Sequence, residues 1–131
     1  MKKTVFVILV FLLFSSVDGF SQKKKIRFQA KTDVADSLEY ELIIIDSGFE
    51  NWLVTKPSRE FYSKEYYELR NRLYVSEWNN RHSTLGGCGL YETYIDYSYS
   101  IDYGLDLNYK LYYYFRYFEE TNKIKLLPYG R

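Results

Sequence analysis

The chain has very few of the side chains that usually cross-link or activate a small protein. Cys88 is the only cysteine and His82 the only histidine among 131 residues. A single cysteine excludes a disulfide within the chain, so the fold must be stabilised by its core alone. We expect Cys88 to be buried and unreactive. A Cys88–His82 dyad is the alternative, but the sequence offers no third residue that would orient it.

Short motifs of common enzymes and metal sites are also missing. The sequence contains no GxSxG, HExxH, CxxC or phosphate-binding glycine loop. Side-chain oxygens alternate between Asp96 and Asp102 with the spacing of a calcium loop. However, Ile101 replaces the turn glycine of such a loop, and Leu107 replaces its closing glutamate. We therefore predict no catalytic residue, no metal and no cofactor.

Neither sign of charge dominates the sequence. Eighteen Lys and Arg residues oppose seventeen Asp and Glu residues, and the formal net charge is +1. This balance argues against nucleic acid as a partner. Basic residues gather only near the N-terminus, at Lys23, Lys24, Lys25, Arg27 and Lys31. We interpret them as part of a solvated lead-in, and a patch for anionic lipid or polysaccharide is the alternative.

No apolar run approaches the length of about 20 residues that a membrane-spanning helix needs. The run over residues 5–14 has ten apolar residues, follows two lysines and precedes several small residues. This layout is typical of a secretory signal peptide. We predict a signal peptide over residues 1–21, cut after Ser21 or, as a second choice, after Gly19. The signal peptide would direct the protein to the periplasm or cell surface, and its cleavage would leave no transmembrane span. An uncleaved anchor is the alternative.

We predict a flexible charged lead-in over residues 22–37 and one aromatic-rich α+β domain over residues 38–131. Its short sheet, with a strand near residues 39–46, would pack against two main helices at about 63–81 and 105–121. The strand begins with alternation and continues as four apolar residues, which is typical of a strand covered on both faces. Asp46 or Ser47 can cap a short helical segment over residues 49–55.

The helix over residues 63–81 is amphipathic, and Ser63 can cap it. Its apolar residues form two stripes: Tyr62, Tyr66, Leu69 and Leu73 in one, and Tyr67, Tyr74 and Trp78 in the other. Between the stripes lie three residues that we interpret as a structural polar cluster: Arg70, Glu77 and Arg81. Glu77 and Arg81 have the i,i+4 spacing of a helical ion pair. We expect a mobile loop over residues 79–90, because it is rich in glycine.

Two periodicities compete after Gly104. Residues 105–121 fit both an alternating strand and a helical stripe. We favour the helix, with Asp102 or Asp106 as its cap and Asn122 as a left-handed stop, and the strand is the alternative. Residues 91–97 should be extended, and residues 123–127 a final short strand or an extended tail.

Aromatic residues are abundant, with sixteen tyrosines, nine phenylalanines and two tryptophans. A small interior cannot pair so many hydroxyl groups, so some phenols should face water and offer a stacking surface. Such a surface suits a glycan, a peptide or a second copy of the chain. A tyrosine-lined core with solvent at its rim is the alternative. The candidate ligand-binding residues are Trp52, Tyr66, Tyr67, Tyr74 and Trp78.

Four stretches together resemble a known family: YELIIIDSGFENWL, FYSKEYYELRNRLYVSEWN, IDYGLDLNYKLYYYFRYF and KIKL. The family is an uncharacterised group of small exported proteins from Bacteroidetes, a domain of unknown function. Many of its members look like lipoproteins, whereas this chain has no cysteine after its apolar run. The resemblance implies export from a Gram-negative cell and assigns no catalytic or ligand-binding residue.

The leading hypothesis for the function is an exported, non-enzymatic binding or structural module that uses an aromatic surface. Its partner would be an envelope protein or a glycan. A second hypothesis is a small periplasmic hydrolase or transferase that uses Glu77 with His82 or Asp96. A third is an envelope protein that self-assembles through residues 91–103, where the alternation is long and the register weakly defined.

Overall fold

The computed structural model describes residues 26–32, 38–85 and 89–128. The expected signal peptide, the lysines at positions 23–25 and Cys88 lie outside these residues. The described elements are β1 (Ile26–Thr32), β2 (Leu38–Ile44), α1 (Ser47–Leu53), η1 (Arg59–Phe61), α2 (Lys64–Thr84), η2 (Gly89–Tyr91) and α3 (Gly104–Asn122). This is a small α+β domain, as predicted. Among the described helices, none is long and apolar enough to cross a membrane.

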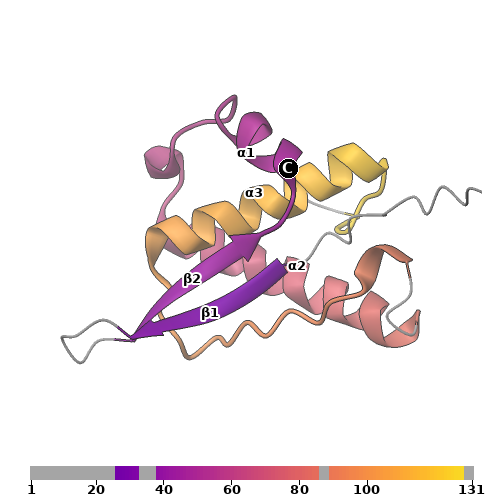
Figure 1. Ribbon diagram of the computed structural model, residues 1–131, viewed down its shortest axis with the longest axis horizontal. Helices are drawn as coiled ribbons and strands as arrows, with labels where there is room; N and C mark the ends of the chain where they lie inside the picture. The colour runs from indigo at the N-terminus through magenta and orange to yellow at the C-terminus, as the bar shows by residue number, and fades with distance from the viewer. Residues whose placement is uncertain (1–25, 33–37, 86–88, 129–131) are drawn as a thin grey trace, which may run out of the picture.

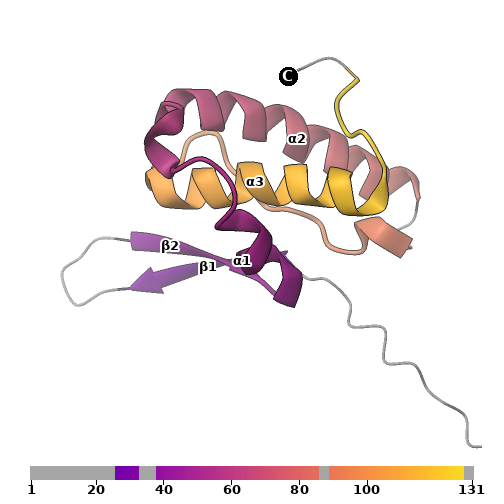
Figure 2. The same cartoon turned by 90° about the horizontal axis from the view of Figure 1, so that it is seen from above.

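The elements stack in layers with α3 at the centre. Figures 1 and 2 show the β1–β2 hairpin on one side of α3 and α2 on the other. Helix α1 follows β2 and also packs on α3. Because α3 contacts the sheet and both other α-helices, it supplies the longest run of core residues, with every position from Leu111 to Phe115 buried.

The hairpin corrects two predictions. Residues 26–32 were expected in a flexible lead-in, but they form β1, which pairs antiparallel with β2 from Ile26–Ile44 to Thr32–Leu38. The sheet is also covered on one face only. Ile26 and Leu42 are buried on the face toward α3, whereas Ile45 is 54% exposed just beyond the strand. A sheet of two strands with one packed face needs only one apolar side, so the apolar run did not indicate burial on both faces.

Two predicted helix caps are confirmed: Asp46, which follows β2, and Ser63, which precedes α2. Asp46 accepts a hydrogen bond from the Gly48 N–H at 3.0 Å, and Ser63 accepts one from the Tyr66 N–H at 3.1 Å. Helix α2 continues to Thr84, so residues 79–84 are helical rather than part of the expected loop.

Only one of the two predicted apolar stripes of α2 is fully in the core. Tyr67, Tyr74 and Trp78 are buried, but Leu69 is 58% and Leu73 48% exposed. Leu69 and Leu73 therefore contribute little to the core, although they lie in the same apolar stripe as Tyr62 and Tyr66. Asn71 and Val75 occupy the buried face instead, because α2 packs against its neighbours on one side only.

Residues 104–122 form the helix α3, so the helical interpretation of this segment is confirmed and the strand alternative is wrong. Gly104 starts it at a φ of 80°, a conformation that glycine adopts readily. The N-cap is Tyr103, whose side chain makes no cap hydrogen bond, so the prediction of Asp102 or Asp106 as the cap was wrong. Asp102 Oδ1 still accepts the Gly104 N–H at 3.0 Å. The left-handed stop is Lys123, at a φ of 56°, one residue later than the predicted Asn122.

Residues 91–103 cross from α2 to the sheet without forming a strand. Side chains of α2 bind the backbone of this segment. The Trp78 indole N–H donates to the Thr93 carbonyl at 2.8 Å. The Asn79 amide donates to the Ile95 carbonyl at 2.8 Å and accepts the Ile95 N–H at 2.9 Å. The ring of Phe28 on β1 contacts those of Tyr97 and Tyr103. The long alternation of this segment therefore reflects packing on both α2 and the hairpin.

Candidate functional site

Helix α1 places one large aromatic side chain at the surface of α3. Asp46 caps this helix, and Phe49 and Leu53 are buried on its inner side. Trp52 lies between them in sequence and is half-buried. Its ring meets the rings of Tyr113 and Tyr117 edge to face, at centroid distances of 6.2 and 5.3 Å. Such contacts hold the indole in one orientation at the rim of the core.

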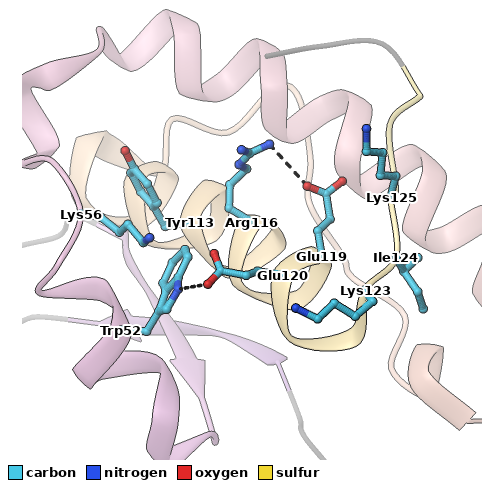
Figure 3. A pocket seen from close by; sticks show the side chains of 9 residues that line it. All are labelled: Trp52, Lys56, Tyr113, Arg116, Glu119, Glu120, Lys123, Ile124 and Lys125. Atoms are coloured by element: carbon cyan, nitrogen blue, oxygen red, sulfur yellow. Dashed lines mark hydrogen bonds and ion pairs between the residues drawn. The ribbon is translucent and has the colours of Figure 1, made fainter.

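A pocket with a volume of about 510 Å³ opens beside this indole. It is lined by Trp52, Lys56, Tyr113, Arg116, Glu119, Glu120, Lys123, Ile124 and Lys125. In Figure 3, Lys56 and Glu120 lie on either side of the Trp52 indole, and the Lys123 side chain points toward them. A pocket of this size is in the range of small-ligand sites.

The last three turns of α3 and the tail after it form one wall of the pocket. Tyr113, Arg116, Glu120 and Lys123 follow one another at spacings of three or four residues, so they share a face of the helix. The left-handed conformation of Lys123 then turns the chain back along α3. Glu119 fixes this return, because its Oε1 accepts a hydrogen bond from the Leu126 N–H at 2.8 Å.

Arg81 of α2 holds the same tail from the other side. Its guanidinium donates to the Lys125 carbonyl at 3.1 Å and to the Tyr91 hydroxyl at 2.8 Å. The predicted i,i+4 pair with Glu77 is confirmed at 2.6 Å. Arg70, the third member of the predicted polar cluster, lies instead over the ring of Tyr74 at 5.5 Å. The Glu77–Arg81 pair therefore has a structural role in joining α2, η2 and the tail.

The charged side chains of the pocket differ in how many hydrogen bonds they make to the rest of the protein. Glu119 accepts bonds from the Tyr74 hydroxyl and from Arg116, at 3.3 and 3.5 Å, in addition to the bond to the tail. Glu120 accepts the Trp52 indole N–H at 3.3 Å. The ammonium of Lys56 lies 4.1 Å from the Trp52 ring centroid, a cation–π distance. Burial raises the pKa of Tyr113 to about 12.

The five predicted ligand-binding residues do not form one surface. Trp52 lines the pocket, and Tyr66 is half-buried and stacks on Tyr62 at 4.2 Å. Tyr67, Tyr74 and Trp78 are no more than 3% exposed, so they are core residues. Assigning these three to a surface was wrong, because an aromatic stripe on a helix gives no information about which rings a neighbouring helix covers.

The predicted acid–base set has separate partners. Glu77 pairs with Arg81, whereas His82 Nδ1 lies 2.6 Å from the Tyr91 carbonyl oxygen and must donate to it. In the described part of the chain no hydrogen bond joins Glu77 to His82, and Asp96 is exposed. Among all the residues that the structure describes, no three or more His, Cys, Asp or Glu side chains lie close enough together to hold a metal ion.

The pocket residues on α3 and the tail were missed in the sequence. Their signal is weak: a run of charged residues at helical spacing that directly follows the aromatic stripe of α3. Such a run is usually a solvated helix face. Only the packing of α1 beside it turns this face into the wall of a pocket.

Fold and pocket together define a small α+β domain with an aromatic, charge-lined cavity beside Trp52. A family model matches residues 4–129, so the chain belongs to a family of unknown function, DUF6146. No curated protein and no solved structure matches the chain.

Proposed function

We propose that this protein is an exported, non-enzymatic binding module, and that the pocket beside Trp52 receives its ligand. One observation carries the proposal: a half-buried indole, fixed by neighbouring rings, faces a cavity that is also lined by charged side chains. Apolar rings with a few convergent polar groups are the usual lining of a ligand site. Trp52 thereby remains from the predicted aromatic surface as the residue that contacts the ligand.

A binding role fits this cavity better than catalysis. Glu119 is held by three donors, which suits a residue that fixes the tail rather than one that exchanges protons. Glu77 and His82 are each bound to a different structural partner. The pocket offers rings for stacking and charges for orientation, which are the requirements for holding a ligand unchanged.

Export is supported by the N-terminal sequence. Two lysines, ten apolar residues and a group of small residues precede the domain in the order of a secretory signal peptide. The resemblance to exported proteins of Bacteroidetes points the same way and would place the domain in the periplasm or at the surface of a Gram-negative cell. The partner is then a glycan or a protein of the envelope.

Export is tested by fractionating cells that express the full chain. We expect the protein in the periplasmic or surface fraction, with a new N-terminus at Gln22. A cytoplasmic protein that still begins at Met1 would contradict export, whereas an uncleaved chain in the membrane fraction would support the anchor alternative.

Binding is tested by capture from envelope and periplasmic fractions on the immobilised protein. Trp52→Ala should lower the captured amount at least fivefold, because removal of the indole removes the stacking face; loss of one such ring is worth about 1–3 kcal/mol. Tyr94→Ala is the matched control, because Tyr94 is 58% exposed and outside the pocket. Circular dichroism of both variants checks the fold. Equal capture by both variants would contradict the proposed site.

A further inference from the structure

We infer that the ligand of this pocket is an acidic saccharide, with a sugar ring on the Trp52 indole and its carboxylate among the lysines. This inference rests on the proposed function and names the ligand class of the same site. It depends on three properties of the pocket: its uncompensated positive charge, its aromatic wall and its remaining acceptors for hydroxyl groups.

The charge of the pocket favours an anion. Four cationic side chains line it, from Lys56, Arg116, Lys123 and Lys125, against two carboxylates. Both carboxylates are engaged by groups of the protein itself. Lys123 and Lys125, by contrast, have exposed side chains with no ion-pair or hydrogen-bond partner in the described part of the chain. A ligand carboxylate would supply the missing counter-charge without displacing a structural contact.

The aromatic wall favours a ring-shaped ligand. The indole of Trp52 is held by the rings of Phe49, Tyr113 and Tyr117, and the long side chain of Lys56 lies over its pocket side. Lys56 is on the segment after α1 and is itself only partly buried, so it can move aside. The C–H face of a pyranose would then pack on the indole, and the displaced ammonium would lie near the ring substituents, where a uronate carries its carboxylate.

The remaining polar atoms suit hydroxyl groups. Glu120 uses one oxygen for the Trp52 indole, and its other oxygen can accept from a sugar hydroxyl. Tyr113, on the same wall of α3, contributes its ring, which holds the Trp52 indole beside these polar atoms. A fatty acid could pair its carboxylate with the lysines, but its apolar chain would then lie against Glu120. That contact would desolvate the Glu120 carboxylate without giving it a hydrogen-bond donor. An acidic saccharide satisfies all three parts of the lining.

The test uses the purified protein and three probes of similar size: trigalacturonate, its methyl ester and a tripeptide of glutamate. Binding is measured by calorimetry and by the ¹H–¹⁵N signals of the two indoles. Trp78 is an internal reference, because its indole N–H is buried and bound to the Thr93 carbonyl. We expect trigalacturonate to shift the Trp52 signal alone. The methyl ester, which keeps the rings but loses the charges, should bind at least tenfold more weakly.

Two variants locate the site. Lys56→Gln combined with Lys123→Asn should weaken trigalacturonate binding at least tenfold; asparagine is chosen because it tolerates the left-handed conformation of position 123. Lys110→Gln removes a cation of α3 outside the pocket and should leave the affinity unchanged. Equal losses in both variants would overturn the inference.

The outcomes separate the ligand class from the proposed function. If the ester binds as tightly as the acid, or if only the glutamate peptide shifts the Trp52 signal, the acidic-saccharide inference is overturned while binding at Trp52 stands. If no probe shifts that signal, the inference is also overturned. The proposed binding at Trp52 fails as well if, in addition, capture from envelope fractions is the same with and without Trp52.

Discussion

Gly48 shows how closely single residues are fitted around the start of α1. A methyl group at this position would lie 2.6 Å from the hydroxyl oxygen of Tyr117. That hydroxyl donates to Asp46 Oδ1 at 3.2 Å, the same oxygen that caps the Gly48 N–H. The Tyr117 ring packs edge to face against the rings of both Phe49 and Trp52, which limits its movement away from Gly48. Glycine is therefore required here by a neighbouring side chain rather than by its own backbone conformation.

We predict opposite effects of Gly48→Ala in two backgrounds. In the natural chain it should lower the free energy of unfolding by about 1–3 kcal/mol, the usual cost of forcing an extra methyl group into a packed site. In the Tyr117→Phe variant the clashing oxygen is gone, and alanine should then be neutral or stabilising by up to about 1 kcal/mol, since it is the better helix former. Urea unfolding of the four proteins measures both effects. The same loss in both backgrounds would contradict this account.

Single aromatic residues illustrate the limit of prediction from this sequence. Trp52 and Trp78 look alike as members of amphipathic segments, but one is half-buried at a pocket and the other is in the core. The caps Asp46 and Ser63 were predictable, because a cap depends on a few neighbouring residues. The exposure of an indole depends on segments that are far away in sequence, so it could not be predicted.

Helix α3 explains why its own secondary structure was ambiguous. The helix lies between the sheet and α2, so Leu111 to Phe115 are all buried. A helix that is covered on most sides has apolar residues at every spacing, including the alternate spacing of a strand. The sequence therefore favoured the helix only through its expected end residues, and the structure ends the helix at Tyr103 and Lys123 instead. Strand β1 was missed for the opposite reason, because a strand with one packed face needs few apolar residues.

A polar network joins α3 to its neighbours inside this apolar layer. Asn108 and Asn71 are both fully buried, and the Asn71 amide donates to the Asn108 backbone and side-chain oxygens at 2.9 and 3.1 Å. The same Asn108 side-chain oxygen accepts the Tyr97 hydroxyl at 2.7 Å. One side chain of α3 thus binds both α2 and the segment over residues 91–103.

We predict that Asn108→Ala lowers the free energy of unfolding by about 1–3 kcal/mol, since it leaves buried donors without their acceptor. Asn80→Ala on α2 is the matched control, because Asn80 is exposed and the same gain in helix propensity applies. Tyr97→Phe should cost less than Asn108→Ala, and the two losses should not add, since both remove the same bond. Strict additivity in urea unfolding, or equal stability of the two asparagine variants, would contradict the network.

At the scale of the whole molecule, tyrosines replace the cross-links that a single cysteine excludes. Seven tyrosines of the described chain are buried: Tyr67, Tyr74, Tyr91, Tyr103, Tyr112, Tyr113 and Tyr114. Several hydroxyls bind a distant element, as Tyr109 does with the Pro57 carbonyl at 2.8 Å. The expectation of many water-facing phenols holds for Tyr94 and Tyr99, which are exposed, whereas the other tyrosines of the described chain are buried or half-buried. The buried tyrosines fit the alternative prediction, a tyrosine-lined core with solvent at its rim.

Such a core makes the stability of the protein sensitive to alkaline pH. Burial raises the pKa of Tyr97, Tyr112 and Tyr114 well above the ordinary value, and that of Tyr113 to about 12. In the unfolded chain these phenols ionise near pH 10, while the folded chain still keeps their protons. The folded state then binds more protons than the unfolded state, so stability is fully present below about pH 10 and falls as the pH rises further.

We predict that the free energy of unfolding is nearly constant from about pH 7 to 9 and then falls, by up to about 1.4 kcal/mol per pH unit for each buried tyrosine. Tyr114→Phe removes one such phenol and should make the decline shallower by about that amount per pH unit. Tyr94→Phe, at an exposed position, should leave the slope unchanged. Urea unfolding at stepped pH, with tyrosinate absorbance recorded in parallel, measures both. An equal slope in the two variants, or tyrosinate formation before unfolding, would show that the buried phenols do not control the alkaline limit of the fold.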